Sequence, residues 1–369
     1  MAILYDENNS KIFSILHTKE NEYCSLQDAK SYFLTLNDES YAFSEISAYG
    51  CYSERNKYDG FFISNNPHEF GIIAGHEFSP FIYRGQNKDY PTFIPTANRY
   101  NLSQKEQLIK RCIDWVKKQE FLQLFQSTPY FIRCQNFQVL NCKFKFDLEA
   151  IAQHYEFMSN YIDITRDLFV ALFFAYTYQK DGIYYPIQDF SKYSPMLYVG
   201  NLKKIYTEHP NSLKIIGFQS LLRPHLQKAM AIEILVKDTF KPLFEKVELP
   251  KNYAFACEIF NKANAGLNLF PNDSMSQIAK QIKENKFLSL ESVREYCNNY
   301  NLNFEEIKIE LQNQSYNLTN ENWGIPYNLY NAINDEIDRH IIPYLNDRVA
   351  FRKISEPLRP ANIAERNIL

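Results

Sequence analysis

The feature that most constrains the fold is an uninterrupted apolar run from Leu168 to Tyr176. The run is roughly half as long as a membrane span. Its apolar side chains cover every side of a helix, which is typical of a helix buried inside a domain. We therefore predict a central buried helix over 166–179 that begins at Thr165 or Arg166, with the preceding Asp163-Ile164-Thr165 held against the core.

Composition supports a folded protein without a strong electrostatic preference. The chain has 369 residues, of which 45% are hydrophobic and 16% aromatic, enough for one large domain or two ordinary ones. Its 40 basic and 43 acidic residues nearly cancel. No global field therefore attracts nucleic acid or an anionic membrane, although a local basic groove remains open. Residues 1–7 lack the pattern of a signal peptide, so we expect a cytoplasmic protein without a membrane partner.

Several kinds of site are not indicated. The seven cysteines are scattered without a C-x-x-C pair, so neither a zinc site nor a disulfide framework is expected. G-x-G-x-x-G, G-x-x-x-x-G-K-[ST], G-x-S-x-G and H-E-x-x-H are all missing. The carboxylates are not clustered at the spacing of metal ligands, which disfavours a nuclease and predicts no metal.

Local patterns predict an α+β fold. Ser103 and Glu106 form a capping box before a helix over 104–126, and Asp147 caps a second helix over 147–156. A strand over 78–83 is expected to deliver Arg84-Gly85 at its end. Further strand-like segments are 58–64, 70–74, 183–188, 196–199, 213–219, 229–236 and 253–260, and those after 180 suggest one sheet.

The last quarter of the chain is helical and more polar. We predict helices over 274–285, 289–299, 303–313 and 327–340. The expected architecture is a mixed or antiparallel β core with packed helices, followed by a mostly helical C-terminal region. The predicted division is 1–75 as the N-terminal part of the core or a short extension, 76–270 as the main domain, and 271–369 as a helical region packed on it.

Three short motifs carry the chemistry. The first is Arg84-Gly85-Gln86, in which the glycine clears space around a planar guanidinium that suits phosphate or carboxylate. Pro91, Pro95 and Arg99 follow it. The second is Gln153-His154-Tyr155 with Asp163, Thr165 and the Ala171–Ala175 stretch. The third is Arg223 with Gln227 four residues later, ahead of a strand that carries Glu233.

Together these motifs resemble the FRG domain, a bacterial and phage module named after a Phe/Tyr-Arg-Gly signature. The chain departs from the family pattern at three places. Glu156 stands where the family usually has glycine, Met158-Ser159-Asn160 replaces Pro-Thr-Arg, and Ala229 replaces the glycine of the third motif. The loop between His154 and Asp163 is therefore expected to differ in shape or in ligand preference.

The resemblance implies an ADP-ribosyltransferase-like fold and nucleotide binding, with NAD as the substrate. Arg84 would anchor the dinucleotide together with Gly85, Gln86, Arg99, Gln153 and Arg223. Thr165 would contact a ribose, and His154 or Tyr155 would stack on or bond to the base. Gln227 or Glu233 would face the reacting carbon, with Asp163 as the alternative carboxylate, because glycosidic cleavage needs a fixed negative charge.

Two functions follow from this resemblance. One is an ADP-ribosyltransferase or NAD glycohydrolase that acts as a toxin or effector in phage defence or bacterial conflict, with a protein or nucleic acid as acceptor. The other is a non-catalytic module that senses a nucleotide or a phage ligand. A carboxylate near a ligand held by Arg84 favours the enzyme, whereas a neutral site favours the sensor. Each residue also has an ordinary structural reading, such as a backbone-carbonyl clamp for Arg84 or a helix cap for Thr165.

Overall fold

A computed structural model describes most of the chain between residues 47 and 341. The described residues are 47–51, 60–66, 69–74, 81–99, 103–136, 138–139, 142–201, 204–205, 208–209, 212–216, 219, 221–234, 240–320 and 325–341. The fold is α+β, as predicted, with a six-stranded antiparallel sheet at its centre and helices packed on it. In spatial order the strands are β11 (Leu213–Ile215), β12 (Ala229–Glu233), β7 (Tyr161–Thr165), β4 (Phe81–Gln86), β10 (Met196–Asn201) and β13 (Phe244–Glu248).

The remaining strands form smaller sheets. β1 (Ser47–Cys51), β2 (Gly60–Asn66), β3 (Glu69–Ala74), β6 (Cys142–Phe144) and β5 (Gln138–Val139) make a five-stranded sheet. β8 (Thr177–Lys180) and β9 (Ile183–Pro186) form a hairpin, and β14 (Phe287–Ser289) pairs with β15 (Asn317–Thr319). The strand predicted over 183–188 exists as β9, but it pairs with β8 and does not join the central sheet.

Helix α6 (Leu168–Tyr176) packs on the central sheet and is buried, as its apolar sequence predicts. A Cβ added to Gly85 would lie 1.7 Å from the carbonyl oxygen of Ala171, so only glycine permits this close approach of strand and helix. The helix begins later and ends earlier than predicted. Asp167 is its cap, because its side chain accepts a hydrogen bond from Phe169 N, and the chain enters β8 after Tyr176.

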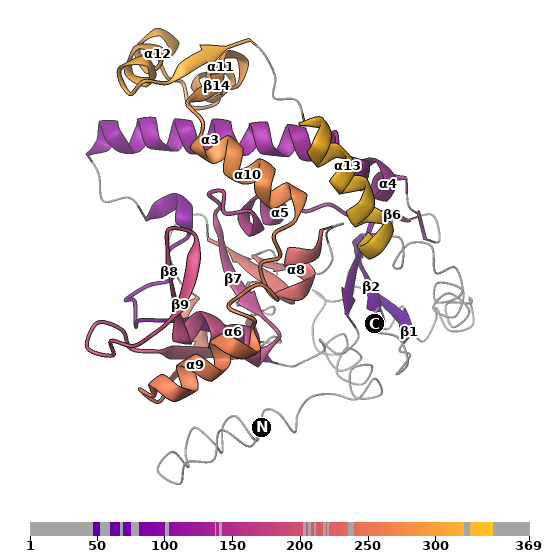
Figure 1. The fold of residues 1–369 in the computed structure, drawn as a ribbon, viewed down its shortest axis with the longest axis vertical. Helices are drawn as coiled ribbons and strands as arrows, with labels where there is room; N and C mark the ends of the chain where they lie inside the picture. Colours follow the sequence, from indigo (N-terminus) through magenta and orange to yellow (C-terminus); the bar gives the residue numbers. More distant parts are fainter. Residues whose placement is uncertain are drawn as a thin grey trace.

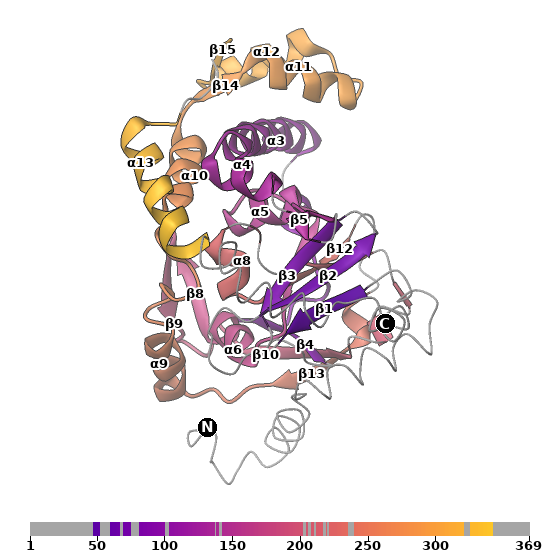
Figure 2. The ribbon, with the colours of Figure 1, turned by 90° about the vertical axis from the view of Figure 1, so that its right-hand side faces the viewer.

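Helix α3 (Gln104–Gln126) has the predicted capping box and joins the C-terminal region to the domain. α10 (Ser274–Glu284), α11 (Leu290–Asn299), α12 (Phe304–Asn313) and α13 (Tyr327–Glu336), which continues as a π-helical turn over Ile337–Ile341, confirm the predicted helical region. α11 and α12 lie beyond α3, at the end of the molecule opposite α6 and α9 (Figures 1 and 2). Residues of α3 share one apolar cluster with α11 and α12 and another with α10 and α13.

Two local predictions are wrong. Residues 253–260 are not a strand but lie in helix α9 (Tyr253–Lys262), which Asn252 caps by accepting from Phe255 N at 3.1 Å. Ala256 and Ile259 of this helix pack against α6, so burial on a helix decides the conformation of an ambiguous apolar run. Arg84 and Gly85 lie within β4 rather than after it, because the strand runs from Phe81 to Gln86.

Three short helices complete the surroundings of the site. α4 spans Pro129–Gln135 and α8 spans Leu222–Leu226, while α5 spans Leu148–His154 with the predicted cap, Asp147. In the part of the chain that the structure describes, no helix combines the length and the apolar character needed to cross a membrane.

Candidate functional site

The central sheet separates the predicted site residues onto two faces. Side chains alternate along a strand, and residues directly opposite in neighbouring strands share a face. Tyr83 lies opposite Thr165 and packs against α6. In β12, Ala229 lies opposite Thr165 and Ala231 lies opposite Asp163, so all four side chains share the face of Tyr83. Ala150 of α5 packs on this face. We call this the helix face; Arg84 points to the other face of the sheet.

Arg84 is buried and acts as a clamp between two strands. Its Nη1 donates to the main-chain carbonyl of Asp163 at 2.5 Å, and its guanidinium lies 5.3 Å from the centroid of the Phe93 ring. Tyr198 lies opposite Arg84 in β10 and meets the Phe93 ring edge-on at 5.1 Å. Arg84 therefore contacts the backbone of Asp163, whereas the carboxylate of Asp163 belongs to the helix face.

His154 and Gln227 form a buried pair on the helix face. His154 Nδ1 lies 3.0 Å from Gln227 Oε1, and Gln227 Nε2 donates to the carbonyl of Leu269 at 3.0 Å. Because a carbonyl only accepts, the amide orientation is fixed and Nδ1 of His154 must carry the proton. Burial lowers the pKa of His154, so the ring stays neutral with a lone pair on Nε2. Among the described residues nothing donates to Nε2.

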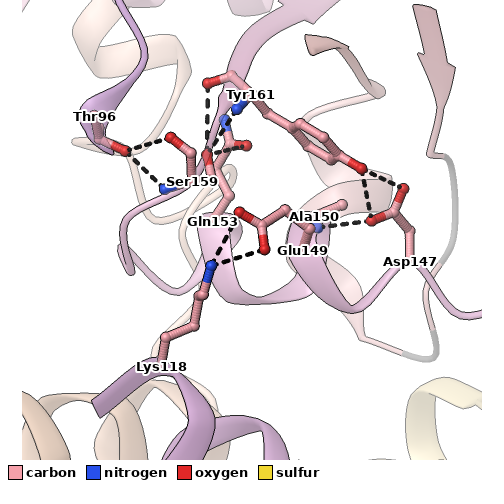
Figure 3. Close-up of polar contacts among 8 residues, drawn as sticks. All are labelled: Thr96, Lys118, Asp147, Glu149, Ala150, Gln153, Ser159 and Tyr161. Atoms are coloured by element: carbon pink, nitrogen blue, oxygen red, sulfur yellow. Dashed lines mark hydrogen bonds and ion pairs between the residues drawn. The ribbon is translucent and has the colours of Figure 1, made fainter. Parts of the chain in front are cut away.

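Asp163 presents an exposed carboxylate beside this pair. Its Oδ1 accepts a hydrogen bond from Gln153 Nε2. The Gln153 amide is itself oriented, because its Oε1 accepts from Ser159 Oγ at 2.8 Å (Figure 3). Ser159 N in turn donates to Thr96 Oγ1 at 3.0 Å, so the loop before β7 rests on the segment that follows the first motif. The Asp163 carboxylate is therefore oriented by a series of hydrogen bonds through Gln153 and Ser159.

A comparison with protein families matches the part of the chain that holds the first two motifs. The model of the FRG domain matches residues 79–182. This part of the chain is an FRG domain. No curated protein and no solved structure matches the chain. Arg84, His154 and Asp163 lie inside the matched segment, whereas Arg223, Gln227 and Glu233 lie beyond it.

Arg223 and Tyr155 connect the FRG domain to the residues that follow it. Arg223 donates to the carbonyls of His154 at 3.2 Å and Pro271 at 3.3 Å, and its guanidinium lies 4.8 Å from the centroid of the Tyr155 ring. The Tyr155 hydroxyl donates to Asp273, the cap of α10, at 2.6 Å. Burial raises the pKa of Tyr155 well above its usual range. Both side chains are engaged inside the protein, and neither presents a face to a ligand.

The other predicted residues lie apart from the exposed carboxylate. Thr165 Oγ1 donates to the carbonyl of Gln227 at 2.8 Å and accepts from Asp167 N, so it links β7 to the start of α6. Glu233 lies opposite Tyr161 and forms an ion pair with Lys214 at 2.8 Å. Arg99 is exposed and donates to the carbonyl of Ile94.

Gln86 ends β4 with a feature that the sequence alone did not reveal. Within the described residues its Oε1 is buried without a hydrogen-bond donor. Such an atom costs free energy unless something donates to it, so it is available to a donor from a ligand.

The sequence singled out Glu156 only as a departure from the family pattern, and it did not single out Lys283, Gln179 or Tyr184. Glu156 has a φ of 67°, the left-handed conformation that explains why the FRG family usually has glycine here. Its carboxylate pairs with Lys283 at 2.8 Å and accepts from Gln179 at 3.1 Å. Burial raises the pKa of the Tyr184 hydroxyl, and the charges of Glu156 and Asp163 raise it further. The only signal in the sequence was the predicted strand around Tyr184.

No site for a metal ion is visible in the described ranges, where no three His, Cys, Asp or Glu residues gather in a suitable group. The described residues place an oriented carboxylate beside a neutral imidazole.

Proposed function

We propose that the FRG domain binds a nucleotide such as NAD on the helix face and cleaves its glycosidic bond, with Asp163 as the catalytic carboxylate. The observation that carries this proposal is the exposed Asp163 carboxylate, oriented by Gln153 and placed beside neutral His154. Departure of nicotinamide leaves positive charge on the ribose. A fixed negative charge next to that carbon lowers the barrier.

His154 supplies the second part of the proposed reaction. When water or an acceptor hydroxyl attacks the ribose carbon, it must lose a proton, and the lone pair on Nε2 of His154 can take it. The bond from ribose to nicotinamide breaks, the new carbon–oxygen bond forms, and the proton passes through His154 to solvent. Attack by water describes an NAD glycohydrolase, and attack by a protein or nucleic-acid hydroxyl describes an ADP-ribosyltransferase.

The roles of the remaining residues follow from their contacts. Arg84 acts in this proposal through the carbonyl of Asp163, which it holds in place. Gln86 lies two residues after Arg84 in β4 and therefore on the same face as Arg84, so its unpaired buried oxygen is not assigned to a nucleotide on the helix face. Glu233 is not assigned to the reaction, because Lys214 neutralises it at the edge of the sheet.

The first experiment compares Asp163→Asn with wild type and with Glu233→Gln as the matched carboxylate control. Asparagine keeps the acceptor for Gln153 and removes only the charge. Each protein is incubated with NAD, with and without bacterial lysate, and nicotinamide release and mass gain are followed by mass spectrometry. We expect Asp163→Asn to lower turnover by roughly 10²- to 10³-fold at an unchanged melting temperature. Equal activity of Asp163→Asn and wild type would remove Asp163 from the mechanism.

A non-catalytic sensor is the second candidate, and one observation favours it. Gln227 of the third motif is neutral, and its amide is held by His154 and by the carbonyl of Leu269, so it supplies no negative charge for cleavage. A sensor would bind NAD or another nucleotide in calorimetry without releasing nicotinamide, and Asp163→Asn would leave affinity unchanged.

The biological part of the proposal is an effector or toxin in phage defence or bacterial conflict. Expression of the wild-type chain in bacteria is expected to slow growth, and Asp163→Asn is expected to relieve the inhibition. Full toxicity of Asp163→Asn would separate the growth effect from NAD cleavage.

A further inference from the structure

The β8–β9 hairpin presents two chemically different faces. Tyr178 lies opposite Tyr185 and Gln179 lies opposite Tyr184, so each pair occupies one face. Gln179 and Tyr184 face inward: Gln179 donates to Glu156, and Tyr184 stacks on Phe270 at 4.8 Å. Tyr178 and Tyr185 belong to the outer face, which takes no part in the site described above.

The outer face carries a stack of three tyrosines. The ring centroids of Tyr178 and Tyr185 are 5.6 Å apart with planes inclined by 25°, and those of Tyr178 and Tyr193 are 5.2 Å apart with planes inclined by 13°. Tyr185 is 39% exposed and Ile183, on the same face, is 57% exposed. We call Tyr178, Tyr185 and Tyr193 the tyrosine stack. It leaves an aromatic surface open to solvent at Tyr185.

Three lysines border this stack. The Nζ atoms of Lys88 and Lys192 lie 5.5 Å and 5.3 Å from the centroid of the Tyr193 ring. Lys180 lies two residues after Tyr178 and thus on the outer face of the hairpin. Among the described residues none of the three lysines forms an ion pair with an acidic side chain. The nearby Asp189 accepts from the Ser191 hydroxyl and from two backbone N–H groups. These hydrogen bonds, and after them the charge of Lys192, lower the pKa of Asp189.

We propose that the outer face of the β8–β9 hairpin binds single-stranded nucleic acid. Exposed aromatic rings accept unpaired bases by stacking, and the ammonium groups of Lys88, Lys180 and Lys192 are complementary to the phosphates between those bases. An acidic peptide would use the lysines but not the stack, and an apolar partner would use the stack but not the lysines. The inference does not rest on NAD cleavage.

The test is a fluorescence-anisotropy titration of the full chain with a labelled 20-nucleotide single strand, over a series of salt concentrations. Tyr185→Ala is expected to weaken binding by at least about fivefold, the loss of one stacked base. The double variant Lys88→Glu and Lys192→Glu is expected to weaken it further. The slope of log affinity against log salt should lessen by about 1.4, roughly 0.7 for each phosphate contact.

Matched controls lie elsewhere on the surface. Tyr327→Ala removes a tyrosine that is 81% exposed at the start of α13, and Lys280→Glu reverses the charge of a lysine of α10 whose side chain is 72% exposed. Both are expected to bind the strand like wild type. Absence of binding by the wild type at low salt would overturn the proposal. So would equal affinity of Tyr185→Ala and Tyr327→Ala, whatever the result of the NAD assay.

Discussion

Arg84 and Arg223 are both buried motif arginines, but they join different elements of the fold. Arg84 spans β4 and β7 on one face of the central sheet, contacting the Asp163 carbonyl and the Phe93 ring. Arg223 spans α5 and the segment before α10, contacting two carbonyls and the Tyr155 ring. Each guanidinium organises backbone around the same small site. A fork that suits phosphate in a sequence motif can equally serve main-chain carbonyls.

The two arginines also differ in whether the polar groups beside them are engaged inside the protein or exposed. Around Arg223, the partners Tyr155 and Gln227 are engaged on their polar atoms. Asp163, which Arg84 holds by its carbonyl, keeps its carboxylate exposed. The exposed carboxylate and the neutral imidazole are therefore on β7 and α5, and the hydrogen-bonded side chains hold these two elements in place.

The largest effect is expected when Arg223 loses its fork. Arg223→Met keeps the apolar stem over Tyr155 but leaves two buried carbonyls without a charged donor. Each such hydrogen bond contributes about 1.5–3 kcal/mol, so the free energy of unfolding should fall by about 3 kcal/mol or more. Urea denaturation measures the change. A loss below about 1 kcal/mol would show that water replaces the fork and that the connection to α10 is weak.

A smaller loss is expected from Arg84→Met. Its carbonyl contact and its position over Phe93 suggest a decrease of about 2 kcal/mol in the free energy of unfolding. NAD turnover should fall as well, because the carbonyl of Asp163 is no longer held. Arg84→Lys is the control variant, because unlike Arg84→Met it keeps the positive charge, although it lacks the planar guanidinium. If Arg84→Lys restores turnover, one charged donor to the Asp163 carbonyl is sufficient, whereas a loss as large as that of Arg84→Met shows that the planar fork is required.

Acid should weaken the Arg223 region first. Burial lowers the pKa of His154, and burial with Lys228 and Arg166 lowers the pKa of His225 to about 4. Below a pH of about 6.5 the two histidines become protonated in the unfolded chain but stay neutral in the folded chain. The free energy of unfolding therefore falls as pH drops from about 6.5 toward 4. In contrast, hydrogen bonds from Lys241, Tyr198 and Lys246 lower the pKa of Asp89 near Arg84, and that stability is lost only in stronger acid.

The measurement is the melting temperature between pH 7.5 and pH 5. Over this interval the free energy of unfolding is expected to fall by at most about 1.4 kcal/mol per pH unit for each histidine, and the melting temperature falls with it. His154→Gln should be less sensitive to acid than wild type over this interval, because glutamine does not titrate. If the melting temperatures of the two proteins fall equally with pH, His154 is not a buried neutral histidine.

The smallest effect is expected at Glu156, which borders both regions. Glu156→Gly relieves a left-handed conformation that costs a non-glycine residue about 1 kcal/mol, but it removes the ion pair with Lys283, worth up to about 1 kcal/mol. The net change in the free energy of unfolding should stay within about 1 kcal/mol. Lys283→Met removes the same pair without relief of the backbone and is expected to be the less stable variant.

Local sequence patterns predicted most of the elements. The capping box at Ser103, the cap at Asp147 and the apolar run after Asp167 are short-range signals, and α3, α5 and α6 form where they occur. The apolar run over 253–260 failed as a strand, because its spacing also fits a helix and only contact with α6 selects between the two.

The candidate site was predictable only in part. Gln153, His154 and Asp163 lie within ten residues of sequence and come together through α5 and β7. Glu233 was placed near them by its position on a late strand, but the register sets it opposite Tyr161 and beside Lys214. Tyr184 was missed, because no motif marks a residue whose role depends on how a hairpin folds back.

By itself, the sequence determined the α+β class, the buried central helix, the helical C-terminal region and the FRG domain, since periodicity, capping and motif spacing are local properties. Only the tertiary structure decided which face of the sheet each side chain occupies. That choice placed Arg84 and the Asp163 carboxylate on opposite faces, and engaged Arg223 and Gln227 with backbone carbonyls. The physical reason is that strand register and side-chain alternation set these contacts, and both depend on partners distant in sequence.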